Sequence, residues 1–154
     1  MKKVSLSALV LAGSLLPVMA QASGRQDTWT RGWGQEVSEF VINGKGQSQL
    51  SLTCEDYGSQ PATVIFTDAS GHQVSMDGDK SLQVSIDGAA PIDISESESR
   101  VGGNNLTQAW AQLRNGKQVS VTGDGVKTAT FTLAGAAKVL PAFGTRGCVS
   151  KDAL

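Results

Sequence analysis

Short runs of alternating apolar and polar residues recur along the chain between turn signals, a pattern typical of a half-buried antiparallel sheet. The second run places Leu50, Leu52 and Cys54 on one face, because successive side chains of a strand point to opposite sides. We therefore expect Cys54 to face the core. The predicted strands span residues 37–42, 49–54, 62–67, 72–76, 81–86, 117–122 and 126–133, with a short edge strand over 91–94.

One segment has helical rather than strand periodicity. Its apolar residues recur at i, i+3, i+4 and i+7 and form a single stripe: Leu106, Ala109, Trp110 and Leu113. Asn105 or Thr107 is expected to cap this helix, and Asn115-Gly116 to end it. Residues 95–104 read as a polar loop, and residues 135–140 as a short helical turn.

These elements predict a mainly β fold, an antiparallel β-sandwich or open barrel with one short helix and a C-terminal helical turn. The chain shows no internal repeat and no linker between domains. We divide it into a cleavable signal peptide over 1–22, a flexible N-terminal segment over 23–36, and a single β-rich domain over 37–154.

The signal peptide is predicted from the first residues. Lys2 and Lys3 form a positive region, residues 4–18 are largely apolar, and small residues precede cleavage after Ala20 or Ala22. This form looks bacterial and places the protein in the periplasm or outside the cell. The apolar run is too short to span a bilayer, and no cysteine follows it to carry a lipid, so we expect no stable membrane anchor.

The charge balance excludes some partners. Removing Lys2 and Lys3 from 13 basic residues leaves 11 against 14 acidic residues, a net charge of −3. A faintly acidic chain without a run of lysine or arginine lacks the pattern of a nucleic-acid binder. The same balance argues against adhesion to anionic lipid.

Cys54 and Cys148 are the two cysteines of the sequence. In an oxidising compartment two cysteines usually form one disulfide. The bridge would close a loop of about 95 residues and stabilise the fold by up to about 4.6 kcal/mol. A thiol nucleophile or metal ligand would need partners, but the sequence has one histidine and no C-x-x-C motif.

We identify no catalytic residue, no cofactor and no metal site. The one histidine, His72, begins a strand and has no G-x-S-x-G motif to accompany it. Asp77-Gly78-Asp79 starts like a calcium loop, but Gly88 stands where the twelfth position requires glutamate. Three carboxylate pairs could support glycosidase chemistry: Glu55 with Asp56, Asp77 with Asp79, and Glu96 with Glu98. Adjacent carboxylates at turns are more often solvated, and turn chemistry already explains these residues.

Trp29 and Trp33 lie in a polar, glycine-rich segment. Tryptophan in such a setting can anchor a protein partner or stack on a sugar. The alternative is that one of them folds back to cover the sheet. Both remain candidates for partner contact, whereas Trp110 belongs to the apolar stripe of the helix and is expected in the core.

The end of the chain resembles the closing segment of small exported bacterial β-domains such as the invasion-associated locus B-like proteins. The resemblance rests on the hairpin Gly116-Lys117-Gln118-Val119-Ser120-Val121, the run Thr130-Phe131-Thr132-Leu133-Ala134-Gly135 leading into a short helix, and Cys148. It implies a non-enzymatic envelope or secreted domain and identifies no catalytic residues.

The sequence therefore favours a periplasmic or secreted binding or accessory protein without enzymatic activity. Such a protein would engage another envelope or secreted protein, for example as an inhibitor. Two alternatives come from other classes. One is a small hydrolase of cell-wall or glycan substrates that uses a carboxylate pair, and the other is a structural subunit that assembles by pairing of edge strands.

Overall fold

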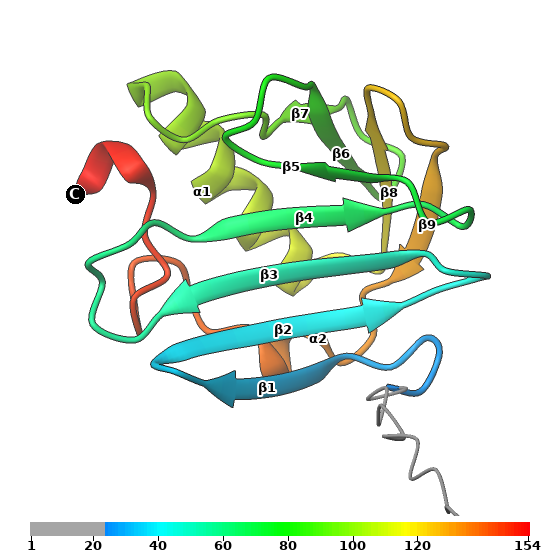
Figure 1. The fold of residues 1–154 in the computed structure, drawn as a ribbon, viewed down its shortest axis with the longest axis horizontal. Helices are drawn as coiled ribbons and strands as arrows, with labels where there is room; N and C mark the ends of the chain where they lie inside the picture. Colours follow the sequence, from blue (N-terminus) through cyan, green and yellow to red (C-terminus); the bar gives the residue numbers. More distant parts are fainter. Residues whose placement is uncertain (1–23) are drawn as a thin grey trace, which may run out of the picture.

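Two antiparallel sheets and one long helix make up residues 24–154, the part of the chain that the computed structural model describes (Figure 1). The predicted signal peptide, 1–22, lies outside the described residues. In the first sheet the strands pair in sequence order: β1 (Thr30–Gly34), β2 (Val37–Asn43), β3 (Gln49–Glu55), β4 (Thr63–Thr67) and β5 (Gln73–Ser75). The second sheet has the order β7-β6-β8-β9 and contains β6 (Leu82–Ile86), β7 (Ile92–Asp93), β8 (Gln118–Gly123) and β9 (Ala129–Thr132).

The long helix, α1 (Arg100–Asn115), connects β7 to β8 and lies behind the first sheet in Figure 1. It contacts β6 and β7, as well as the short helices α2 (Ala136–Val139) and η1 (Lys151–Ala153). The predicted stripe of four apolar residues faces inward and is buried. Burial of this stripe, which includes the whole Trp110 side chain, holds the helix against the sheets.

The core forms where the inner faces of the two sheets meet. Leu50, Leu52 and Cys54 alternate inward along β3, as the pattern predicted. Phe66 of β4 and Phe131 of β9 pack edge to face with ring centroids 6.2 Å apart, which joins the two sheets across the core. This arrangement confirms the mainly β fold, with two antiparallel sheets.

The predicted disulfide is confirmed. Cys54 of β3 is bonded to Cys148, whose Cα lies 4.8 Å away, and both cysteines are buried. The bridge ties the C-terminal segment to a central strand of the first sheet. The predicted helical turn over 135–140 is also confirmed, as α2.

The sheet begins earlier than the sequence pattern indicated, in the segment 23–36 that was predicted to be a flexible chain. β1 pairs with β2 from Thr30 opposite Val41 to Gly34 opposite Val37. All five residues of β1 are exposed, because it is an edge strand with little packed against it. A strand without a buried face needs no alternation of apolar and polar residues, so the pattern could not reveal it.

The long helix also begins earlier than predicted. Residues 95–104 were expected to form a loop, but α1 starts at Arg100, where the Ser99 hydroxyl caps it by accepting a hydrogen bond from the Gly102 N–H at 3.0 Å. The pair Gly102-Gly103 favoured the prediction of a loop, because glycine usually weakens a helix. At position 102 it is required by packing, since a Cβ would lie 2.5 Å from the Glu96 carbonyl oxygen.

Candidate binding site

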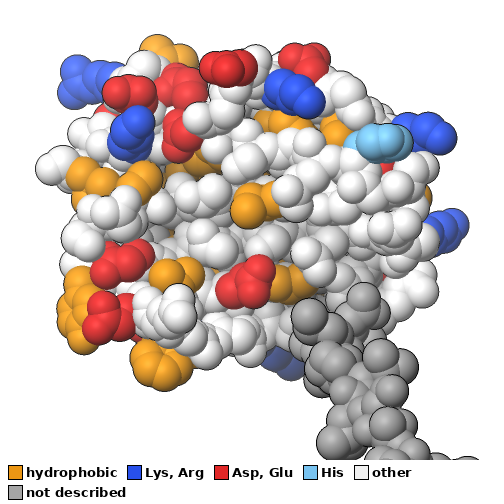
Figure 2. All heavy atoms as spheres, viewed as in Figure 1, with side chains coloured by type: hydrophobic (Ala, Val, Ile, Leu, Met, Phe, Trp, Pro, Cys, Tyr) orange, Lys and Arg blue, Asp and Glu red, His pale blue; other side chains and the backbone are white. Residues whose placement is uncertain are grey.

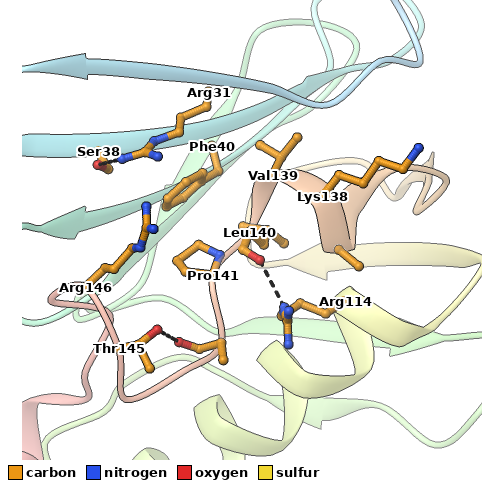
Figure 3. A pocket seen from close by; sticks show the side chains of 12 residues that line it. Arg31, Ser38, Phe40, Arg114, Lys138, Val139, Leu140, Pro141, Thr145 and Arg146 are labelled. Carbon is orange, nitrogen blue, oxygen red and sulfur yellow. Dashed lines mark hydrogen bonds between the residues drawn. The ribbon is translucent and has the colours of Figure 1, made fainter.

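A pocket of about 400 Å³ lies between β1, β2 and the segment 137–146, which contains most of α2 and the residues after it (Figure 3). The pairing of Arg31 with Phe40 places both side chains on the same face of the first sheet. The segment 137–146 forms the opposite wall, and Arg114 reaches the pocket from the last turn of α1. Three elements that are distant in the sequence therefore meet at one concave site.

Arg31 is held in place by two neighbours. Its Nη2 donates a hydrogen bond to Ser38 Oγ at 3.0 Å, and its guanidinium carbon lies 5.8 Å from the centre of the Phe40 ring. Ser38 and Phe40 are both buried, whereas Arg31 is exposed. The contact with the ring orients the guanidinium and leaves most of its donors free for a ligand.

A chain of hydrogen bonds links this pocket to Trp33. Ser38 Oγ donates to Asp56 Oδ1 at 3.0 Å, and Trp33 Nε1 donates to Asp56 Oδ2 at 2.6 Å. Asp56 itself is fixed by its backbone N–H, which donates to the Glu36 carbonyl oxygen at 2.8 Å. The carboxylate of Asp56 therefore orients the indole on one side and the serine beneath Arg31 on the other.

The opposite wall is held by α1. Trp110 Nε1 donates to the Pro141 carbonyl oxygen at 2.9 Å, and Arg114 Nε donates to the Leu140 carbonyl oxygen at 3.0 Å. The ring of Phe143 packs on Trp110 with centroids 5.4 Å apart. These contacts attach an irregular segment to the rigid core, so the wall of the pocket has a defined shape.

Arg146 enters the pocket from a tight turn next to the disulfide. The Cys148 N–H donates to the Thr145 carbonyl oxygen at 3.0 Å, and the two residues between them have positive φ, 50° at Arg146 and 71° at Gly147. Glycine is required at 147 because a Cβ would overlap the backbone carbonyl of Glu55. Arginine in the left-handed region costs on the order of 1 kcal/mol, and the turn and the disulfide hold it there.

The pocket is strongly basic. Arg31, Arg114, Lys138 and Arg146 contribute to its lining, which contains no aspartate or glutamate. Within residues 24–154 the ion pair between Lys151 and Glu98 and the contact between His72 and Asp68 involve none of these four cations. Sequence reasoning missed this cluster because its members are far apart in the chain and form no basic run.

The structure separates the two candidate tryptophans. Trp29 is 5% exposed, and its Nε1 donates to the Thr132 carbonyl oxygen at 2.9 Å, so Trp29 covers the core. Trp33 is 68% exposed, and Tyr57, in the turn after β3, is 76% exposed. Trp33 is therefore the candidate that a partner could reach.

The outer face of the first sheet has two hollows of about 450 and 440 Å³, but Glu39 lines both and neither gathers several basic residues as the first pocket does. Over β1 to β4, Figure 2 shows mostly backbone and side chains that are neither hydrophobic nor charged, with small hydrophobic and acidic groups among them. The outward residues of β3 are Gln49, Ser51, Thr53 and Glu55. The basic pocket is formed on the opposite side of β1 and β2, where Arg31 and Phe40 point.

The candidate catalytic groups serve the local structure. His72 is exposed and lies 3.3 Å from the carboxylate of Asp68. In each of the three carboxylate pairs, at least one member accepts a hydrogen bond from a backbone N–H. Glu55 binds the Ser59 N–H at 2.7 Å, and Asp77 binds the Ser97 N–H at 3.1 Å.

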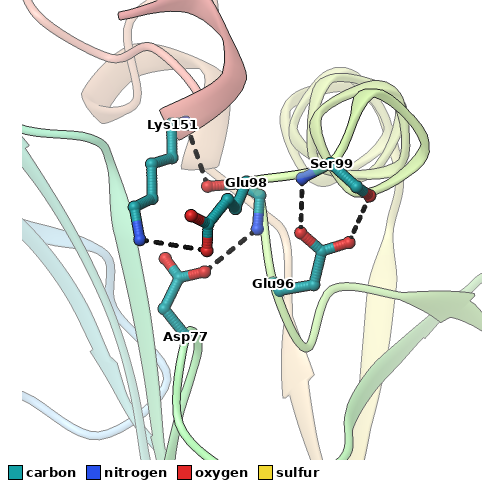
Figure 4. A network of polar contacts seen from close by, with 6 residues as sticks. Asp77, Glu96, Glu98, Ser99 and Lys151 are labelled. Atoms are coloured by element: carbon teal, nitrogen blue, oxygen red, sulfur yellow. Dashed lines mark hydrogen bonds and ion pairs between the residues drawn. The ribbon is translucent and has the colours of Figure 1, made fainter.

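Glu96 belongs to a network at the start of α1 (Figure 4). The Ser99 hydroxyl and backbone N–H donate to its carboxylate at 2.5 and 2.8 Å, and these bonds hold the pKa of Glu96 below its usual value. A general acid in glycoside hydrolysis needs a raised pKa instead. Glu98 pairs with Lys151 at 3.3 Å, which fastens the C-terminal segment to this loop.

Among residues 24–154, no three histidine, cysteine, aspartate or glutamate side chains gather in a way that could hold a metal ion. The helices of this part of the chain are too short or too polar to cross a membrane.

One family model, described as YfjT, matches residues 27–140. The match includes every strand from β1 to β9 together with α1 and α2, and it ends before Arg146 and Cys148. No curated protein and no solved structure matches the chain. The resemblance to invasion-associated locus B-like proteins is not tested by these matches and stays a prediction.

Proposed function

We propose that this chain, which belongs to the YfjT family, is an exported protein of the bacterial envelope that binds another envelope or secreted protein. Its role would be that of an accessory protein or inhibitor, without catalysis. The predicted signal peptide supports export to the periplasm or beyond, and the buried disulfide suits an oxidising compartment.

The observation that carries the proposal is the position of Trp33. Trp33 is 68% exposed, yet the 2.6 Å hydrogen bond from its indole to Asp56 holds the ring in one orientation. A large aromatic side chain that is already fixed loses little conformational entropy when a partner covers it. Tryptophan is for this reason among the residues most enriched at the centres of protein interfaces.

The surroundings of Trp33 offer further contacts. It lies on β1, the edge strand of the first sheet, so one side of this backbone is open to pairing with another chain. Tyr57 provides a second exposed aromatic ring in the turn that also contains Asp56. An extended segment of a partner could pair with β1 and place an apolar side chain on Trp33.

The test is a crosslinking pulldown from the periplasm and the culture medium with the purified, oxidised protein. We expect one specific envelope or secreted protein to be recovered with the wild type and lost with Trp33→Ala. Val101→Ala is the matched control, because Val101 is a similarly exposed hydrophobic residue, 70% exposed, on α1. Recovery that is equal for both variants, or the absence of any specific protein, would contradict the proposal.

The open edge of β1 also favours a second function, assembly of the chain with copies of itself through edge-strand pairing. In that case the oxidised protein should form larger species as its concentration rises, measured by light scattering after size-exclusion chromatography. Arg31→Pro should prevent this assembly, because the Arg31 N–H points to the open edge of β1 whereas the Gly32 N–H faces β2. Proline cannot donate a backbone hydrogen bond to a pairing strand. A monomer at all concentrations would rule this function out.

A further inference from the structure

We propose that the basic pocket between β1, β2 and the segment 137–146 binds a carboxylate that is attached to a small apolar group. This site is separate from the exposed face of Trp33 and goes beyond the binding of a protein partner there. The ligand class follows from the charges, the free hydrogen-bond donors, the walls and the size of the pocket.

The first step is the charge. Arg31 and Arg146 point toward each other across the space beside Phe40 in Figure 3, one from β1 and the other from the turn before Cys148. Two guanidinium groups that face each other repel unless an anion lies between them. Within the described residues neither guanidinium is in an ion pair. The nearest carboxylate linked to Arg31, that of Asp56, reaches it only through the Ser38 hydroxyl and does not lie between the two arginines.

The second step is the supply of hydrogen-bond donors. Arg31 uses one donor on Ser38, and Arg146 has no hydrogen-bond partner within residues 24–154. A guanidinium has five N–H groups in a planar fork that matches the two oxygens of a carboxylate. The pocket therefore offers two preformed forks, one of which is oriented by contact with a buried ring.

The third step distinguishes a carboxylate from a phosphate. Phosphate sites in proteins typically use backbone N–H groups at a helix N-terminus or in a nest. This pocket instead receives Arg114 from the last turn of α1, and α2, with four residues, is too short to provide an N-terminal phosphate site. Helix C-termini present carbonyl oxygens and partial negative charge, which disfavours an anion with two charges more than an anion with one.

The fourth step is the nature and size of the walls. Val139 and Pro141, both half-buried, provide apolar surface beside the arginines, and the buried Phe40 ring lies against Arg31. A volume of about 400 Å³ is at the small end of ligand pockets. The ligand is thus a compact molecule or residue with one carboxylate, either a free carboxylic acid or the C-terminal residue of a peptide.

The experiment follows the arginine Nε–H signals of the oxidised, exported protein by NMR during titration. The probes are 4-methylpentanoate, its neutral amide, inorganic phosphate, and acetyl-Ala-Ala-Leu with either a free or an amidated C-terminus. We expect saturable shifts of the Arg31 and Arg146 signals with both free carboxylates and none with the amides. Tighter binding of the peptide would identify a chain terminus as the source, and equal binding would identify a free acid.

Arg146→Gln should weaken carboxylate binding at least about tenfold, because it removes one charged fork. Arg100→Gln, on the exposed first turn of α1, is the matched control and should leave the affinity unchanged. Thermal unfolding of both variants checks that the fold is intact. The proposal is overturned by the absence of saturable shifts, by tighter binding of phosphate than of either carboxylate, or by equal loss of affinity in the two variants.

Discussion

The carboxylate of Asp68 accepts a hydrogen bond from the backbone N–H of Lys127 at 2.9 Å, across 59 positions of the sequence. Asp68 begins the turn between β4 and β5, and Lys127 lies in the loop between β8 and β9, so this bond joins the two sheets. The same carboxylate accepts the N–H groups of Ser70 and His72, each at 2.9 Å. The bond from Lys127 is the largest cause that lowers the pKa of Asp68, to about 2, although burial acts to raise it.

This pKa predicts how the stability of the fold depends on pH. Because the folded-state pKa of Asp68, about 2, lies below its ordinary value of 3.8, the carboxylate stabilises the fold above about pH 4. Its contribution is lost as the pH falls from about 4 toward 2. We expect Asp68→Asn to lower the thermal midpoint at pH 7, and to lower it progressively less as the pH approaches 2, measured by circular dichroism.

Asp79→Asn is the control for this prediction, because Asp79 is exposed in the turn before β6. Its thermal midpoint should follow that of the wild type at each pH. A constant difference between the wild type and Asp68→Asn from pH 7 to pH 2 would show that the carboxylate charge has no part in joining the sheets.

The strands were predictable from the local alternation of apolar and polar residues. The disulfide was predictable from the oxidising compartment to which export would lead. Leu50, Leu52 and Cys54 alternate in the sequence as they do in β3, and the inward position of Cys54 follows from a period of two. Pairing of the two cysteines followed from their number and from the predicted export. The position of α1 was predicted only in part, since Gly102 weakens the helical pattern while the packing requires it.

The basic pocket was not predictable, because it depends on contacts between distant parts of the chain. Arg31, Arg114 and Arg146 come from an edge strand, the end of a helix and a turn beside the disulfide. No sequence motif connects these three arginines, and the small net charge of the chain gives no indication that they lie together in the fold. Asp68 likewise has the sequence context of an ordinary turn residue, and nothing in it indicates that the carboxylate binds the Lys127 N–H beside the other sheet.

Gly102→Ala tests the close packing at the start of α1. Helix propensity alone would make alanine more stable by up to about 1 kcal/mol. The structure predicts the opposite, a loss of about 1–3 kcal/mol, because the new Cβ would press on the Glu96 carbonyl oxygen. The measurement is the free energy of unfolding from urea titration. Asn104→Ala, at an exposed position of the same helix, should be neutral or stabilising, and a gain in stability for Gly102→Ala would refute the prediction.

Removing the disulfide should destabilise the protein and loosen the turn that carries Arg146. For the double variant Cys54→Ser, Cys148→Ser we expect the free energy of unfolding to fall by about 2–5 kcal/mol, since the bridge closes a long loop in the unfolded chain. Urea titration of the variant should agree with that of the wild type in reductant. If the urea midpoint were unchanged both in the double variant and in the reduced wild type, the bridge would have no stabilising role.

Trp29 and Trp33 should respond to truncation in opposite ways. Trp29→Ala should lower the free energy of unfolding by about 3–5 kcal/mol, because it empties a buried site and removes the hydrogen bond to Thr132. Trp33→Ala should cost about 1 kcal/mol or less, since an exposed side chain loses only its bond to Asp56. Trp29→Phe keeps an aromatic ring but not the N–H, so its loss in the free energy of unfolding should lie between the losses of these two variants. If Trp33→Ala proved as destabilising as Trp29→Ala, Trp33 would be a structural residue, and its loss of partner binding could no longer be assigned to an interface.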